Sequence, residues 1–239
     1  MTNASRIPKL ERLWDKPSEA RYLWTAVFAV VAAVTLKAWL TMSGIVPLNS
    51  DEAIVALMAR HILQGERPVF FYGQAYMGSL DAWLIAGVFA IFGIQTWVIR
   101  LMQGLLYLLT LVSTAWLGRL AFGTWRAGIV ALWFLAIPTI NLTLYTTASL
   151  GGYGEALLIG NLILITGVSI LERLRGGNKP GAILWLAMGG LMGLGFWAFG
   201  LTLVYTIPML LYLGVWLWRL AHKSASGIQV TANEICLAG

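Results

Sequence analysis

The chain has few charged side chains: Asp, Glu, Lys and Arg make up only 11% of its 239 residues, while 59% are hydrophobic. This composition, with a mean hydropathy of +0.78, excludes an ordinary soluble domain and indicates an integral membrane protein in contact with a lipid bilayer. The net charge of +6 does not indicate nucleic-acid binding, because the basic residues lie between apolar runs, as topology signals do. The single cysteine, Cys236, excludes an internal disulfide.

Several apolar runs have about the length that a bilayer core requires. They are Tyr22–Met42, Trp97–Leu117, Ala127–Tyr145, Tyr153–Leu171, Ala182–Ala198 and Leu201–Trp218. The run Leu80–Phe92 is shorter and favours an interfacial or re-entrant helix, with a tilted further span as the alternative. We therefore expect an all-α polytopic membrane protein with about six to seven transmembrane helices and an interfacial helix in the first external loop.

The lysine, proline and glycine residues of these runs lead to further predictions. Lys37 lies near the end of its run, where its side chain can extend to the lipid headgroups, so we assign it no chemistry. Pro138 and Pro208 should kink their spans. The glycines of the fifth run and its turn are expected to pack against neighbouring helices; they are Gly189, Gly190, Gly193, Gly195 and Gly200.

The basic residues give the topology. With six spans, all but four of the 16 basic residues face the cytoplasm, the exceptions being Lys37, Arg60, Arg67 and Arg100. The sequence thus predicts a multi-pass plasma (inner) membrane protein with cytoplasmic tails at residues 1–21 and 220–239. The membrane core covers residues 22–219, and its loop at residues 43–96 is external.

That loop contains the one long segment that is not uniformly apolar, Asn49–Gly93. Ser50 can cap a helix whose first turn holds Asp51 and Glu52, where negative charge suits the helix dipole. An apolar face then recurs at helical spacing: Ile54, Leu57, Met58, His61 and Ile62. Gly65 can end this helix, which should lie flat at the membrane surface.

Two more carboxylates join Asp51 and Glu52 on the external side. Asp81 lies where the loop returns to the membrane, and Glu155 follows the glycine-rich stretch 151–154, which allows a backbone or ligand to come close. Acids at the edge of hydrocarbon are functional candidates. The alternative is an interfacial acid paired with Arg60, Arg67 or Arg100. His61 has no ligand partner at metal spacing and is expected to pack or hydrogen-bond.

The loop resembles a known family. Its motifs are Asn49-Ser50-Asp51-Glu52-Ala53, Met58-Ala59-Arg60, Ile62-Leu63-Gln64-Gly65, Tyr72-Gly73-Gln74-Ala75-Tyr76-Met77-Gly78-Ser79-Leu80-Asp81 and Phe92-Gly93. They are similar to the first external loop of GT-C glycosyltransferases, within the group of protein mannosyltransferases and aminoarabinose transferases that use polyprenyl-phosphate sugars. Gly193-Leu194-Gly195-Phe196-Trp197 and Ile207-Pro208 also resemble bacterial members. The resemblance extends over about residues 22–218.

The resemblance implies a transfer of sugar from a lipid-linked donor on the external face. Asp51 would act as general base on the acceptor with Glu52 beside it, while Arg60, Tyr76, Asp81 and Glu155 would bind substrate. An arginine (Arg60, Arg67 or Arg100) or a divalent metal would stabilise the departing polyprenyl phosphate. We assign no metal ligands and no certain cofactor.

The chain also departs from that family. Members usually continue for as many residues again, so this chain resembles the N-terminal membrane core. Met77-Gly78-Ser79 replaces a Glu-Lys-Pro segment whose acid binds metal, and a later lysine is absent from Trp197-Ala198-Phe199-Gly200. An alternative is therefore a non-catalytic subunit of a larger membrane complex, such as an energy-transducing or photosynthetic assembly. A transporter is a weaker third interpretation, since no inverted repeat is visible.

Overall fold

The computed structural model describes residues 17–225, so most of both predicted tails lies outside the described residues. The described part is almost entirely helical, with one short hairpin. Its helices are α1 (Pro17–Ser43), α2 (Ser50–Leu63), α3 (Leu80–Phe92), α4 (Thr96–Phe122), α5 (Trp125–Ala136), α6 (Ile140–Tyr145), α7 (Tyr153–Arg175), α8 (Ala182–Ala198), the 3₁₀ turn η2 (Gly200–Thr202) and α9 (Leu203–Ala225). Residues 17–21 and 220–225, assigned to the tails, are helical instead.

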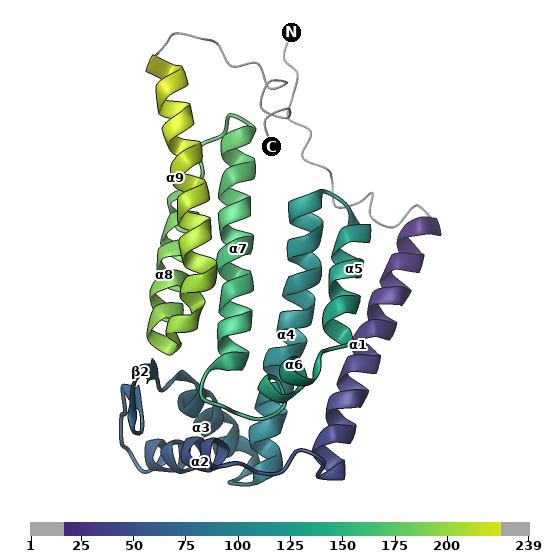
Figure 1. Cartoon of the computed structure of the whole chain (residues 1–239), viewed down its shortest axis with the longest axis vertical. Helices are drawn as coiled ribbons and strands as arrows, with labels where there is room; N and C mark the ends of the chain where they lie inside the picture. Colours follow the sequence, from purple (N-terminus) through teal and green to yellow (C-terminus); the bar gives the residue numbers. More distant parts are fainter. Residues whose placement is uncertain (1–16, 226–239) are drawn as a thin grey trace.

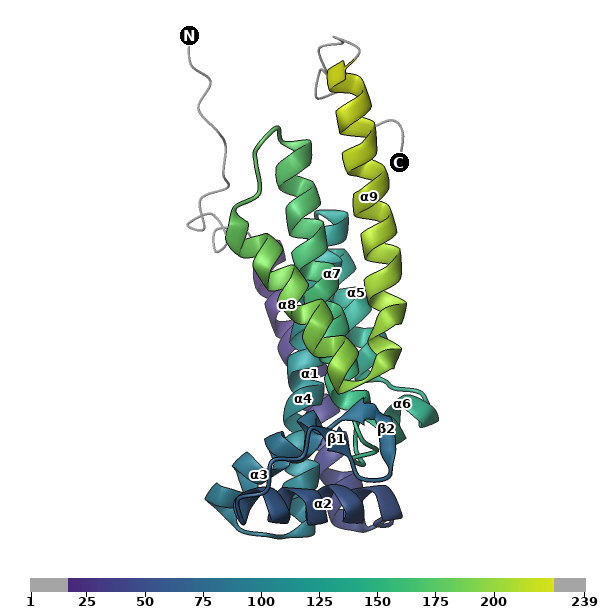
Figure 2. The ribbon, with the colours of Figure 1, turned by 90° about the vertical axis from the view of Figure 1, so that its left-hand side faces the viewer.

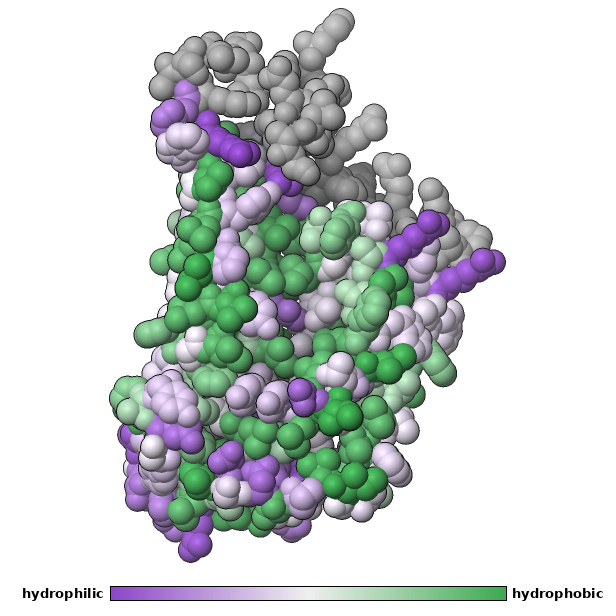
Figure 3. All heavy atoms as spheres, in the orientation of Figure 1, coloured by the Kyte–Doolittle hydropathy of each residue, from purple (hydrophilic) through white to green (hydrophobic). Residues whose placement is uncertain are grey.

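The long helices stand side by side as an upright bundle, and α2, α3 and the hairpin lie across one end of it (Figures 1 and 2). Within the described residues 17–225, four helical segments are long and apolar enough to cross a membrane: Ala20–Ser43, Thr96–Phe122, Tyr153–Arg175 and Gly200–His222. On the face seen in Figure 3, most side chains along the middle of the bundle are apolar, and polar ones are more frequent toward its ends. The described residues thus form a helical bundle that can contact a bilayer with several crossings.

Two of the predicted spans are shorter than a bilayer core. The predicted span Ala127–Tyr145 is wrong, because α5 stops at Ala136 after 12 residues, about 18 Å. Pro138 ends this helix instead of kinking it: proline lacks an N–H, and it holds Ile137 out of the helical region. The helix α8 has 17 residues, also fewer than a typical span. By contrast, Pro208 lies inside α9.

Residues 49–93, which we call the end layer, contain α2, the hairpin and α3. Asn49, not Ser50, caps α2: its side chain accepts from the Glu52 amide at 2.9 Å, and the Glu52 carboxylate accepts from the Asn49 amide, which completes a capping box. Gly65 follows the helix with a φ of +101°, as its predicted ending requires.

The buried face of α2 matches the predicted one in part. Met58 and Ile62 are buried and Ile54 packs on the same core, but Val55 and Ala59 are buried as well and Leu57 is 45% exposed. Apolar residues lie on two adjacent faces of α2, and the face that contacts α3 is the buried one. The predicted short helix Leu80–Phe92 is confirmed as α3, which packs on α2 and α4 rather than standing upright in the bundle (Figure 2).

A hairpin that the sequence did not predict attaches the end layer to α8. Strands β1 (Phe70–Phe71) and β2 (Gln74–Gly78) pair antiparallel. Met77 also bridges Phe199, and the Trp197 indole donates to the Val69 carbonyl at 3.0 Å. A Cβ atom on Gly78 would lie 2.5 Å from the Trp197 carbonyl oxygen, so only glycine fits this contact.

The predicted helix-packing glycines of α8 are mostly wrong. Gly195 packs closely against Thr202 and Ile159, but a Cβ on Gly189, Gly190 or Gly193 would meet no atom within 4 Å, and the same holds for Gly200. Close helix approaches lie elsewhere, at Gly118 and Gly128 between α4 and α5 and at Gly160 and Gly167 on α7.

Candidate functional site

Three of the predicted acids, Glu52, Asp81 and Glu155, are buried at the end of the bundle where α2 crosses it, and Asp51 precedes them in the same helix turn as Glu52. Asp51 lies in the first turn of α2, half-buried, and its carboxylate has no hydrogen-bond or ion-pair partner among residues 17–225. Since no donor occupies them, the carboxylate oxygens of Asp51 are available to accept a hydrogen bond or a proton from a bound molecule.

Glu52 is differently placed. Its side chain is fully buried and receives two hydrogen bonds from Arg100 of α4, from Nε to Oε1 and from Nη2 to Oε2, both at 3.2 Å. The Arg100 side chain is itself only 8% exposed. This two-point ion pair joins the first turn of α2 to the first turns of α4 and realises the predicted pairing of an interfacial acid with Arg100.

Asp81 and Glu155 come together from α3 and α7. Both are buried, and the charge of each acts on the other, while neither carboxyl oxygen of Glu155 has a hydrogen-bond partner among the described residues. Asp81 Oδ1 accepts from Gln103 Nε2 at 3.0 Å, and Oδ2 accepts from the hydroxyl of Ser149. Burial raises the pKa of Asp81 above its usual range, and these hydrogen bonds partly offset that rise.

The glycine-rich approach to Glu155 makes this meeting possible. Gly151 and Gly152 have φ values of +76° and +120°, which disfavour other residues. A Cβ on Gly154 would lie 2.6 Å from Gln103 Oε1. The glycines therefore bring the start of α7 against α4 and the hairpin, as the predicted close backbone approach requires.

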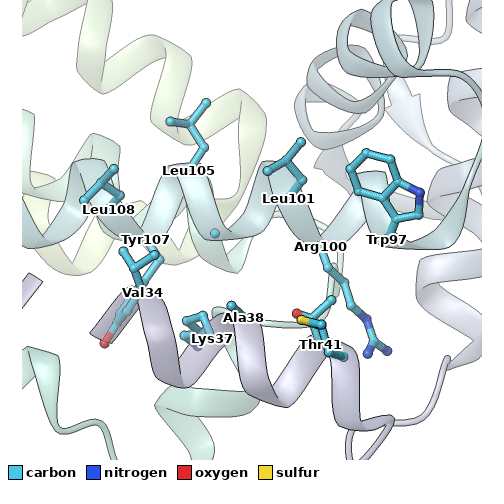
Figure 4. A pocket seen from close by; sticks show the side chains of 12 residues that line it. Val34, Lys37, Ala38, Thr41, Trp97, Arg100, Leu101, Leu105, Tyr107 and Leu108 are labelled. Carbon is cyan, nitrogen blue, oxygen red and sulfur yellow. The ribbon is translucent and has the colours of Figure 1, made fainter. Parts of the chain in front are cut away.

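A groove of about 500 Å³ lies between α1 and α4, and Arg100 and Lys37 are among its lining residues (Figure 4). Its other walls are apolar, with Val34, Leu101, Leu105 and Leu108 prominent. The open shape and apolar lining suit a hydrocarbon chain. Arg100 also binds Glu52, so the Arg100 side chain connects the groove to the first turn of α2.

The assignment of Lys37 to the lipid headgroups is wrong. Its ammonium is buried and donates to the Thr143 carbonyl at 3.0 Å and to the hydroxyls of Thr146 and Thr147 at 2.5 and 2.7 Å. It also lies 4.5 Å from the centre of the Tyr107 ring. After the helix break at Pro138, α6 stays at the surface but the residues that follow it, 146–149, are buried, and Thr146 and Thr147 among them supply acceptors.

The remaining predicted residues lie apart from the buried acids. Arg60 and Tyr76 are exposed, Tyr76 at 69%, and neither side chain has a hydrogen-bond partner among the described residues. His61 hydrogen-bonds as expected, with Nδ1 3.1 Å from the Tyr72 hydroxyl. That hydroxyl donates to Glu66 at 2.8 Å, and this hydrogen bond raises the pKa of Tyr72.

The possible divalent metal does not fit this arrangement. Within residues 17–225, no three His, Cys, Asp or Glu side chains lie together as a metal site would need. Glu52 is neutralised by Arg100, and Asp81 and Glu155 form only a pair. We therefore derive no step through a metal.

Comparisons of the chain with protein-family models, with curated proteins and with solved structures each find no match.

Sequence reasoning missed three polar residues of this region: Gln103, Ser149 and Lys37. Gln103 and Ser149 lie within apolar or small-residue stretches, where a lone polar side chain carries no pattern. A buried acid needs hydrogen-bond donors from neighbouring segments. The presence of Asp81 and Glu155 next to apolar runs was therefore the only indication in the sequence that such donors exist.

Proposed function

We propose that this chain is a GT-C-like membrane glycosyltransferase, or the core of one, that transfers a sugar from a polyprenyl-phosphate donor. The observation that carries the proposal is the double role of Arg100: it lines the α1–α4 groove and binds Glu52, the residue next to Asp51. A lipid chain in the groove would place its phosphate end near the free carboxylate of Asp51. The loop motifs around Asp51, Tyr76 and Asp81 add the resemblance to this family.

The proposed reaction uses Asp51 as general base. As the oxygen of an acceptor hydroxyl attacks the anomeric carbon of the donor sugar, Asp51 takes the hydroxyl proton. The bond from that carbon to the phosphate oxygen breaks, and its electron pair leaves with the polyprenyl phosphate. Arg100 contributes positive charge at that end of the groove. Glu52 holds Arg100 and the start of α2 in place.

Replacing Asp51 with asparagine should lower transfer by roughly 10²–10⁴-fold, because an amide cannot accept the proton. The measurement is sugar transfer from polyprenyl-phosphate sugars by purified protein in lipid nanodiscs. Glu66→Gln is the matched control, an exposed acid of the same end layer. Equal activity of Asp51→Asn and the wild type would remove Asp51 from the chemistry.

Filling the groove should block the donor without unfolding the protein. A Cβ on Gly104 would meet no atom within 4 Å, and this glycine lines the groove. Gly104→Phe should raise the KM for the lipid donor by roughly tenfold or more, equivalent to about 1.4 kcal/mol of binding. Gly87→Phe, at an equally open position on α3, is the control. An unchanged KM would place the donor elsewhere.

The proposal requires the end layer on the non-cytoplasmic side. Arg119, Arg126, Arg173, Arg175 and Arg219 lie at the opposite end of the bundle, which supports that orientation. In a Cys236→Ser background, Leu57→Cys on α2 should react with an impermeant maleimide added to intact cells. Asn178→Cys, in the α7–α8 turn, should react only after permeabilisation. The reverse pattern would reject the external site.

A non-catalytic membrane subunit is the second candidate. The exposed glycines of α8, Gly189 and Gly193, stand four residues apart with nothing packed on them, an arrangement that suits close contact with a helix of another subunit. Under this function the chain copurifies with a larger complex in mild detergent, and Gly189→Leu, but not Asp51→Asn, releases it.

A further inference from the structure

The Asp81–Glu155 pair is the most enclosed charged group that the proposed reaction does not use. The two residues are 2% and 1% exposed, and the charge of each acts on the other. A hydrogen bond between two such carboxyl groups can form only when one of them holds a proton. Two adjacent buried carboxylates would also repel each other strongly.

The available donors decide which oxygen atoms carry the charge. Asp81 accepts from Gln103 and Ser149, so both its oxygens are satisfied as a carboxylate. Neither carboxyl oxygen of Glu155 has a side-chain donor among the described residues. A buried carboxylate without donors is costly, but a protonated carboxyl can donate to Asp81 and satisfy itself. The proton therefore belongs on Glu155.

The neighbouring elements supply no cation to replace that proton. Glu52 of α2 is the other carboxylate whose charge acts on Asp81, and it is already paired with Arg100 of α4. Helix α8 and residues 146–152 contain no titratable side chain. Tyr72 of the hairpin donates to Glu66, Tyr76 is exposed, and Tyr153 stacks on Tyr145. The pair thus depends on one proton to carry a single negative charge instead of two.

We propose that Asp81 and Glu155 share one proton and that this protonated pair fastens the end layer to the bundle. Asp81 is the point at which α3 meets α7, the segment before α7 and α4 at once. Loss of the proton would leave two anions in contact and push α3 away from α7. The folded state holds a proton that an exposed carboxyl releases above its ordinary pKa of about 4. The attachment is therefore complete at low pH and weakens as the pH rises through the raised pKa of the buried pair.

The first test is infrared spectroscopy of the purified full chain in lipid at about pH 7, where exposed carboxyls are ionised. The wild type should show a carbonyl band of a protonated carboxyl, of the intensity of one group. Glu155→Gln should lose the band, and Glu172→Gln, at the exposed far end of the same helix, should keep it. Absence of the band in the wild type would overturn the proposal. So would a divalent metal that the wild type retains and Glu155→Gln loses, because two carboxylates would then share a cation.

The second test reports the opening of the end layer. Ala82, next to Asp81, is 1% exposed, so Ala82→Cys in a Cys236→Ser background reacts with maleimide only when α3 separates. As the pH rises, labelling should accelerate by up to about tenfold per pH unit beyond the increase from thiol ionisation. The same substitution combined with Glu172→Gln should behave identically. Adding Glu155→Gln or Asp81→Asn should abolish the excess, and its persistence in both would overturn the proposal.

Discussion

Arg100→Met should destabilise the protein by about 3–5 kcal/mol, because it leaves the Glu52 carboxylate buried without its cation. Glu52 is fully buried, and Arg100 supplies both of its charge-assisted hydrogen bonds. The Asn49 amide, 3.4 Å away, is too weak a donor to compensate. The free energy of unfolding, measured with denaturant in detergent micelles, gives this loss directly.

A double variant tests whether this loss comes from the unpaired charge of Glu52 or from the changed shape of the side chain at position 100. Glu52→Gln combined with Arg100→Met removes both charges, and glutamine retains the capping-box acceptor for the Asn49 amide. The double variant should recover most of the stability that Arg100→Met alone loses. Arg60→Met on the exposed face of α2 should have little effect. If the double variant is no more stable than Arg100→Met, the pair does not carry this energy.

The bounds of α2 and α3 could be predicted because local signals fix them. Asn49 to Glu52 form a cap within four residues, and Gly65 and Gly93 end the two helices with positive φ. The length of the Leu80–Phe92 run was sufficient to keep α3 out of the set of long spans. These features depend only on residues that are close together in the sequence, so the sequence alone can reveal them.

The interior partners could not be predicted because they come from distant parts of the chain. Lys37 contacts residues more than 100 positions away, in α6 and the buried segment after it, beyond the point where Pro138 ends α5. A proline in an apolar run has two outcomes, a kink or an end, and the helices packed around it decide between them. Asp81 and Glu155 were each candidates, but nothing in the sequence showed that they would meet.

The glycines also show that contacts between distant parts of the chain could not be predicted from the sequence. The dense cluster on α8 suggested a packing surface, yet Gly189, Gly190 and Gly193 face open space, while the widely separated Gly118 and Gly128 bring two helices into backbone contact. The backbone contact at Gly118 and Gly128 needs one glycine on each of two helices at matching heights. Clustering along one helix does not report that relation.

Gly128→Leu should therefore disrupt the bundle severely. A Cβ at this position would overlap the Ala115 carbonyl oxygen and lie 3.2 Å from the Arg119 amide nitrogen, and the opposing Gly118 already approaches the Gly128 Cα. Backbone atoms cannot move aside as a flexible side chain can, so α5 must separate from α4. We expect a loss at or above the upper end of about 1–3 kcal/mol, the usual range for overpacking.

The helix α5 also packs on α1, so its displacement should loosen that contact as well. The yield of monodisperse protein and its unfolding midpoint in detergent measure the effect. Gly104→Leu is the control on α4, since its Cβ would meet open space and the added side chain costs no contact. Equal stability of the two variants would show that α4 and α5 are not in backbone contact at Gly118 and Gly128. In that case, the packing of α5 on α4 would not be what holds α6 and the acceptors of Lys37 in place after the helix ends at Pro138.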